Sequence, residues 1–207
     1  MIPPAEALAR LREGNKRFVS NVRSLDSFLG RARTLDHTAP QTPFAVILGC
    51  SDSRVPAEMV FDQGVGDLFV IRVAGNIVAP SQVGSVEFAV EQFGTRLVVV
   101  LGHSHCGAID ATIHALRDPQ STRSVNLRSI VNRVRPAVEG VLAASGARDA
   151  AVIAHEAVRA NVRASADHLR HGSELLEKKI LTGDLQVVGA EYSLETGVVD
   201  FFDGVSH

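Results

Sequence analysis

The sequence predicts an α/β fold whose mostly parallel central sheet, of about four parallel strands plus an antiparallel edge strand, is flanked by helices. Continuous apolar runs at 44–48, 68–71 and 97–101 are typical of strands buried on both faces of a parallel sheet. Segments with helical periodicity lie between and after these runs. The chain then closes with two strand-like segments around a turn at 195–197, which predicts an antiparallel hairpin.

The expected helices follow from apolar stripes and from residues that favour helix starts. Residues 3–20 begin with two prolines, which suit the first turn of a helix, and carry leucine and phenylalanine near one stripe. Residues 81–93 place valines and a phenylalanine on one face. Residues 21–42 are irregular and polar. Further helices are expected at 107–117, 124–143 and 149–181, the last with a break near Gly172, and the closing strands at 185–192 and 197–202.

Length and composition indicate one domain. The chain has 207 residues, of which 45% are apolar and 21% charged, so residues 1–207 fit a single domain with a substantial core. The net charge of −2 gives no sign of a nucleic acid or an anionic membrane as partner. The N-terminus lacks a basic segment followed by an apolar one, and the apolar runs are far too short to span a membrane. We therefore expect a cytoplasmic protein.

Residues that bind metals follow two of the predicted strands. Cys50 comes just after the first apolar run, and His103 and Cys106 come just after the third. Ligands collect at the carboxyl ends of strands in α/β sheets, where neighbouring loops separate. Zinc prefers thiolate and imidazole ligands, and three protein ligands leave a fourth position for water, as in catalytic sites. His105 is a competing imidazole that spacing alone leaves open.

The two cysteines of the chain have a second interpretation as buried thiols with no chemical role. A structural disulfide is not expected in a reducing compartment. For Cys50 or Cys106 alone, packing at a strand end is the more common explanation. Both cysteines and His103 at equivalent strand ends favour a metal site.

Asp52 and Arg54 form the second feature of the first cluster. Asp52 is two residues from a proposed thiolate ligand, which is close enough for its carboxylate to reach the metal. Arg54 offers a planar fork that binds a carboxylate through two hydrogen bonds. We therefore expect a switch, in which Asp52 is either held by Arg54 or becomes the fourth metal ligand. The alternative is that Ser51, Asp52 or Ser53 caps the short segment after Pro56 and that Arg54 is a surface partner.

The charge of the proposed ligands sets the expected chemistry. Two thiolates and one neutral imidazole cancel the charge of zinc, so this centre is a weaker Lewis acid than one with three histidines. Its bound water should ionise less readily than water on three-histidine zinc, whose pKa is about 7. A carboxylate that accepts the hydrogen bond of that water would fix its orientation.

The segments Cys50–Arg54 and His103–Gly107 resemble the paired motifs of the beta-class carbonic anhydrases. The resemblance extends from about Phe44 to Ala111, and more loosely over the whole chain. It implies a zinc enzyme, with one Zn2+ per subunit, that catalyses reversible hydration of CO2 to bicarbonate and a proton via zinc-bound hydroxide. The implied zinc ligands are Cys50, His103 and Cys106, and the implied catalytic dyad is Asp52 and Arg54, with Asp52 as the fourth ligand in a closed state.

The same resemblance implies a substrate pocket and self-association. The implied substrate-binding residues are Gln41, Phe69, Phe88 and Gly107, since CO2 needs a dry apolar wall. The family forms homodimers, which can pair into homotetramers. Residues 1–35 would form a helical arm that packs on a partner subunit, and Gln41 would act on the partner's site. The chain departs from the family at two positions. Ile47 stands where bicarbonate-regulated bacterial members carry a tryptophan, and Ala74 stands where many members carry a valine that lines the pocket.

Two other functions remain as alternatives. Related sequences hydrolyse other small carbon compounds, such as carbon disulfide, by closing access to the site. A non-catalytic zinc-dependent regulatory protein would keep Asp52 permanently on the metal, and the presence of Arg54 argues against this. A redox role for the thiols is weaker, because the chain has no Cys-x-x-Cys pair.

Overall fold

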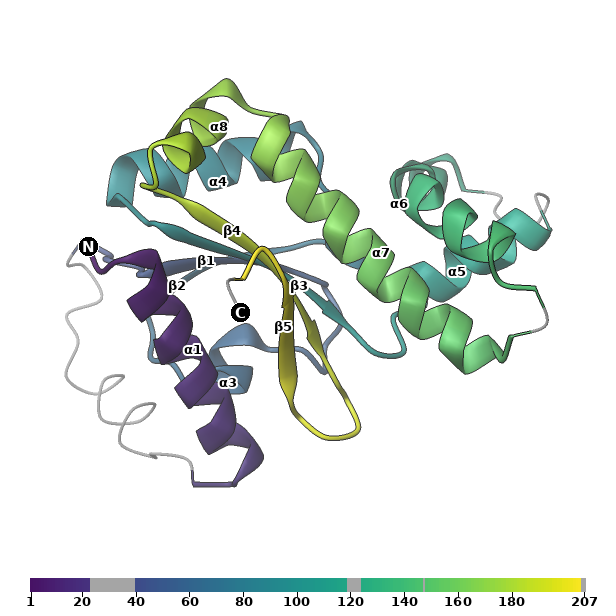
Figure 1. Cartoon of the computed structure of the whole chain (residues 1–207), viewed down its shortest axis with the longest axis horizontal. Coiled ribbons are helices and arrows are strands. Elements are labelled where there is room, and N and C mark those ends of the chain that lie inside the picture. The colour runs from purple at the N-terminus through teal and green to yellow at the C-terminus, as the bar shows by residue number, and fades with distance from the viewer. Residues whose placement is uncertain (23–39, 119–123, 147, 206–207) are drawn as a thin grey trace.

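One sheet organises the computed structural model of the chain, which describes residues 1–22, 40–118, 124–146 and 148–205. Within these residues five strands pair in the order β2-β1-β3-β4-β5 (Figure 1). Four of them run parallel, and β5 is antiparallel to β4. The strands are β1 (Ala45–Gly49), β2 (Leu68–Arg72), β3 (Leu97–His103), β4 (Gln186–Tyr192) and β5 (Val199–Asp203). The predicted fold class is confirmed.

The central strands are apolar throughout because both of their faces are covered. Every residue of β1 and β3 is buried. Side chains alternate between faces along a strand, so successive residues enter different cores. Ile47 and Val99 enter the core on one face, and Leu48 and Val100 enter the core on the other.

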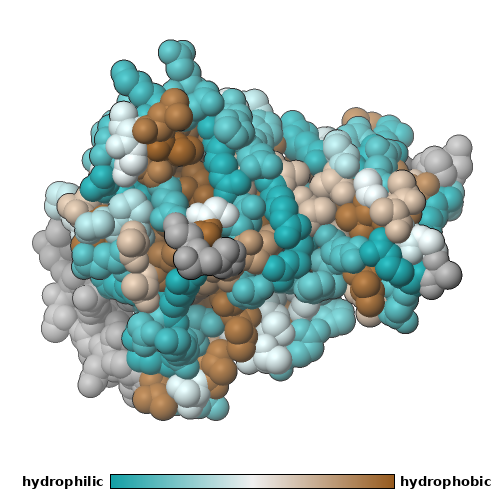
Figure 2. Space-filling model, viewed as in Figure 1, coloured by the Kyte–Doolittle hydropathy of each residue, from teal (hydrophilic) through white to brown (hydrophobic). Residues whose placement is uncertain are grey.

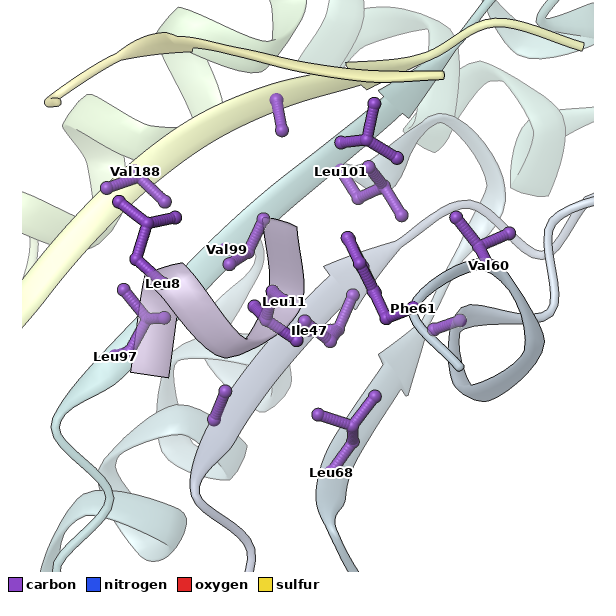
Figure 3. Close-up of a cluster of buried hydrophobic side chains, with 14 of the residues drawn as sticks. Leu8, Leu11, Ile47, Val60, Phe61, Leu68, Leu97, Val99, Leu101 and Val188 are labelled. Carbon is purple, nitrogen blue, oxygen red and sulfur yellow. The ribbon is translucent and has the colours of Figure 1, made fainter. Parts of the chain in front are cut away.

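The first face is covered by α1 (Pro4–Val19) and the short α3 (Ala57–Val60). Figure 3 shows Leu8 and Leu11 of α1 among the side chains of the strands, in the same cluster as Phe61. The apolar stripe of α1 is therefore buried against its own sheet. Packing of the arm 1–35 on a partner subunit would have to use the other face of α1 or residues 23–35, which lie outside the described residues.

The second face is covered by three helices, which lie above the sheet in Figure 1. They are α4 (Pro80–Phe93), α7 (Ala150–His171) and α8 (Glu174–Leu181). Gly172 ends α7, and the side chain of Ser173 caps α8 by accepting from the Leu176 N–H. This is the break that the sequence predicts near Gly172.

A third core lies at the carboxyl end of the sheet. It is built from α5 (Gly107–Arg117), α6 (Val125–Ala143) and the amino-terminal half of α7. Beside it, the 3-10 turn η2 (Ala74–Asn76) follows β2. Cys50 and Cys106 belong to this core, so a buried helical layer closes over the strand ends.

The predicted elements agree with the structure to within a few residues, apart from α3 and η2, which the sequence analysis did not anticipate. Both are four residues or fewer, too short for a periodic pattern. Most of the irregular segment 21–42 lies outside the described residues.

The surface carries no broad apolar layer on the face seen in Figure 2. Hydrophilic residues cover most of that face, and hydrophobic residues gather in separate small patches. Among the described residues, no helix is long and apolar enough to cross a membrane.

Candidate metal centre

Three predicted ligands converge at the carboxyl ends of β1 and β3. Cys50 follows β1, His103 ends β3, and Cys106 is the residue before α5. Their ligand atoms lie within 4.8 Å of one another, and all three residues are buried. The strands that carry them are parallel neighbours, so their carboxyl ends meet at one edge. His105, the competing imidazole, is not part of this group, because its exposed ring contacts Glu195 instead.

The imidazole of His103 is oriented as a metal ligand requires. The ring is fully buried, and its Nδ1 lies 2.8 Å from the Ser104 carbonyl oxygen. A carbonyl only accepts, so Nδ1 carries the proton and Nε2 presents a lone pair. Within the described part of the chain, Nε2 has no hydrogen-bond partner. A buried polar atom without a partner costs roughly 1–3 kcal/mol, and a bound cation would remove that cost.

The Cys106 thiol donates a hydrogen bond to the Cys50 sulfur. This contact lowers the pKa of Cys50 and raises the pKa of Cys106. The Gly75 N–H also donates to the Cys50 sulfur at 3.4 Å. A metal ion that bound both sulfurs would displace the thiol proton of Cys106. Two sulfurs and one free imidazole nitrogen form a donor set that suits zinc.

Asp52 and Arg54 form a two-pronged ion pair beside these ligands. Arg54 Nε donates to Asp52 Oδ1 at 2.9 Å, and Arg54 Nη2 donates to Asp52 Oδ2 at 2.7 Å. The Arg54 backbone N–H donates to Oδ1 at 2.9 Å. These bonds lower the pKa of Asp52 below its ordinary value. The carboxylate is also 3.9 Å from His103 Nε2. It therefore borders the cluster of Cys50, His103 and Cys106, here called the metal group, while Arg54 holds both of its oxygens.

Arg72 and η2 support the turn that carries Cys50. Arg72 donates through Nε to the Cys50 carbonyl at 3.2 Å and through Nη2 to the Asp52 carbonyl at 2.6 Å. Gly75 lies in η2 at φ +68°, a left-handed conformation that glycine adopts without strain. Asn161 of α7 donates to the Gly75 carbonyl at 2.8 Å, which ties the residue whose N–H faces Cys50 to α7.

Of the predicted pocket residues, some lie close to the three ligands and others lie away from them. Gly107 directly follows Cys106 and has open space around the position that a Cβ would occupy. Gln41 is exposed and precedes β1, so it lies at the opposite end of this strand from Cys50. Phe69 is three residues from the end of β2, about 10 Å along the strand. Within one chain, the structure therefore brings Gly107 to the metal group but leaves Gln41 and Phe69 away from it.

Phe88 lies with Phe69 and Phe93 in an aromatic cluster on the α4 side of the sheet. The Phe88 ring centroid is 6.3 Å from that of Phe69 and 5.5 Å from that of Phe93. Phe88 is nevertheless 51% exposed. The role of Gln41, Phe69 and Phe88 in substrate binding stays a prediction.

Two groups near the site were missed by sequence reasoning. Glu195, in the turn after β4, accepts from the Ser104 hydroxyl at 2.8 Å and contacts His105 Nε2 at 2.5 Å. Glu191, at the end of β4, is buried beside Arg159. Both acids are far from the two motifs in sequence, and no local pattern links them to the motifs.

A cavity of about 570 Å³ extends from Cys106 toward β5. It is lined on one side by α7 and on the other by the ends of β4 and β5. Glu191 Oε2 lies 3.1 Å from His155 Nε2 and 3.5 Å from Arg159 Nη1, and the latter also contacts Asp200 at 2.8 Å. Glu191, His155, Arg159 and Asp200 thus form a polar wall of the cavity.

The comparison with family models agrees with this site. A model described as carbonic anhydrase matches residues 45–199, which span β1 to β4 and both motifs and end at the first residue of β5. The chain belongs to the beta-carbonic anhydrase family. The match covers most of the chain, so family membership concerns the whole fold and not the metal group alone.

Individual relatives of this family are similar over nearly the whole chain. Carbonic anhydrase 2 of Mycobacterium tuberculosis is 38% identical over 198 residues, which is 94% of this chain and 90% of that protein. Carbonic anhydrase of Mycolicibacterium smegmatis is 39% identical over 197 residues, 95% and 92% of the two chains. Among solved structures, the beta-carbonic anhydrase CcaA matches with a TM-score of 0.73 at 27% identity, covering 98% of this chain and 94% of that one.

Proposed function

We propose that this protein is a zinc-dependent carbonic anhydrase that catalyses the reversible hydration of CO2 to bicarbonate and a proton. The observation that carries the proposal is the buried His103 Nε2 without a partner among the described residues, beside two cysteine sulfurs. The relatives named carbonic anhydrase at 38–39% identity support the choice of reaction. CO2 hydration is the general reaction of the family. The identity of the metal as zinc is our proposal.

Cys50, His103 and Cys106 would hold the zinc ion. When bound, zinc would supply the Lewis acidity that makes a water molecule nucleophilic. The residues of this chain prepare the surroundings. The Gly75 N–H stabilises the Cys50 thiolate, and the Ser104 carbonyl fixes the tautomer of His103.

Asp52 would orient the attacking oxygen by accepting its hydrogen bond. To do so it must remain charged and off the metal, and the fork of Arg54 serves both requirements by engaging both carboxylate oxygens. This arrangement favours the enzyme over the regulatory alternative, in which Asp52 would occupy the metal permanently. The open space at Gly107 would leave room for a small substrate beside Cys106.

Self-association would complete the substrate pocket. Gln41 and Phe88 are both exposed and lie away from the metal group of their own chain. A homodimer, or a tetramer of paired dimers, in which they face the site of a partner subunit would give them the substrate-binding role expected from the family. Sedimentation velocity of wild type and Phe88→Asp tests this, with dissociation expected for the variant. A monomeric wild type would contradict it. A cytoplasmic location also stays part of the proposal.

CO2 hydration followed by stopped-flow at pH 8.5 tests the proposed function directly. We expect rapid hydration that rises with pH, that a chelator removes and that added zinc restores. Protein with one zinc per chain and no hydration would overturn the proposal. Carbon disulfide is assayed in parallel, and turnover of that substrate alone would establish the alternative reaction.

A further inference from the structure

The loop between the two carboxyl-terminal metal ligands is held from outside by the turn that joins β4 and β5. The Ser104 N–H donates to the Tyr192 carbonyl at 3.0 Å, and the Leu194 N–H donates to the Ser104 hydroxyl at 2.9 Å. That hydroxyl donates in turn to Glu195 Oε2, while Glu195 Oε1 contacts His105 Nε2. Glu195 therefore uses both of its oxygens on the loop that lies between His103 and Cys106.

His105 has a backbone conformation that needs such support. Its φ is +53°, in the left-handed region, which is strained for a residue with a side chain. Strained conformations of this kind persist where the surrounding contacts determine them. The Ser104 bonds hold the residue before it, and Glu195 holds its ring, so the turn after β4 fixes this conformation.

The conformation of His105 matters because of its carbonyl group. That carbonyl accepts from Arg54 Nη2 at 3.3 Å, the same nitrogen that donates to Asp52 Oδ2. The guanidinium is thus positioned by two acceptors, the Asp52 carboxylate and the His105 carbonyl. If the carbonyl turned away, Arg54 would have Asp52 alone to orient it, and its side chain is mostly exposed.

The turn that carries Glu195 is itself fixed to the core. Asn15 of α1 is buried, and its Nδ2 donates to the Gly197 carbonyl at 2.8 Å and to the Val60 carbonyl at 3.1 Å. Its Oδ1 accepts from the Val199 N–H at 2.9 Å. The amide of Asn15 therefore clamps the hairpin to α1, and Glu195 acts from a rigid support.

We propose that Glu195 is a positioning residue for the dyad, acting through Ser104 and His105 to fix the orientation of Arg54 on Asp52. The proposal rests on the proposed carbonic anhydrase function. The contribution is one of geometry more than of charge, because both partners of the Glu195–His105 pair are largely exposed and water screens their attraction. The hydrogen bond from Ser104 lowers the pKa of Glu195 to about 2, so the carboxylate keeps both acceptors throughout the working range.

Two substitutions of Glu195 separate geometry from charge. Glu195→Gln retains an oxygen for Ser104 and an amide nitrogen that can meet His105, whereas Glu195→Ala removes both contacts. The matched control is Glu13→Ala, which breaks an exposed ion pair with Lys16 on α1. Each variant is loaded with zinc and measured for CO2 hydration, and the Nε–Hε signal of Arg54 is followed by NMR as a readout independent of activity.

We expect Glu195→Ala to lower kcat/KM by about tenfold, with a shifted or broadened Arg54 signal, because small displacements of oriented groups are costly. The kcat/KM of Glu195→Gln should stay within about twofold of the wild-type value, and that of Glu13→Ala should equal the wild-type value. An unchanged rate and Arg54 signal in Glu195→Ala would overturn the proposal, as would a lower Tm with both readouts unchanged. If wild type does not hydrate CO2, the proposed function fails, and the Arg54 signal still decides whether Glu195 positions it.

Discussion

Asp52 and Glu191 are two sheltered carboxylates that lie at strand ends of the same sheet, and each contacts an arginine. Their side chains are 16% and 7% exposed. The pKa of Asp52 is lowered by its hydrogen bonds from Arg54, whereas burial raises the pKa of Glu191. The same kind of partner therefore gives opposite results at two places in the molecule.

The geometry of each arginine explains the difference. Arg54 places two nitrogens on the two oxygens of Asp52. Arg159 gives Glu191 a single contact at 3.5 Å, because the same nitrogen lies closer to Asp200. A shared contact does not offset the loss of water around a buried carboxylate. The engaged fork, and not the proximity of an arginine, keeps a sheltered acid charged beside the metal group.

Removal of the Asp52 charge should have the largest effect. We expect Asp52→Asn to lower kcat/KM for CO2 hydration by about a hundredfold, because the group that orients the attacking oxygen is lost. Zinc content should be unchanged, since Asp52 is not among the three ligands. Glu191→Gln is the matched control at the other acid, and we expect its rate to stay within about twofold of wild type. Equal losses in the two variants, measured by stopped-flow, would abolish the functional contrast between the acids.

A second substitution removes the two-nitrogen geometry of Arg54 and keeps its positive charge. Arg54→Lys keeps a cation but presents one nitrogen in place of two, so we expect kcat/KM to fall by about tenfold. Arg159→Lys should change the rate by less than twofold, because its contact with Glu191 is already single and shared. A fully active Arg54→Lys would show that charge suffices and that the bidentate geometry is unimportant.

The smallest expected effect concerns stability and pH at Glu191. Its pKa in the folded chain is above the ordinary value of 4.5, so the folded state binds this proton more tightly than the unfolded state does. Stability from this group is present at low pH and is lost as the pH rises through the folded pKa. Relative to wild type, Glu191→Gln should therefore become more stable as the pH rises from 5 to 8.

Urea unfolding at the two pH values measures this shift. The groups that face Glu191 are His155, Arg159 and Asp200, and all three are retained in the variant. Glu156→Gln, on the exposed side of α7, is the control and should show no such dependence. If the stability of wild type and of Glu191→Gln changed with pH in the same way, the pKa of Glu191 would not be raised in the folded chain. The contrast with Asp52 would then fail.

The same two regions show what the sequence could predict. The metal group was predictable because Cys50, His103 and Cys106 follow two buried strands, and parallel neighbours bring such segments together. The apolar runs that predict those strands are buried on both faces, as expected. Asp52 and Arg54 were predictable because both lie within four residues of a ligand in one turn.

The remaining features depend on contacts between distant segments. Glu195 meets His105 across 90 positions, and Arg159 meets Glu191 across 32 positions. No periodicity or motif relates such residues, since their proximity follows from how the β4–β5 hairpin and α7 pack. The turn η2 was also missed, because its shape depends on Gly75 at positive φ and on Asn161 of α7.

X-ray absorption at the zinc edge reports which atoms bind the metal. We expect one zinc per chain, with two sulfur ligands, one imidazole nitrogen and one further light atom. Cys106→Ser should lose one sulfur from that shell, whereas Asp52→Asn should keep both. A zinc shell without sulfur in the wild-type protein, or one unchanged by Cys106→Ser, would show that Cys50, His103 and Cys106 do not form the metal centre.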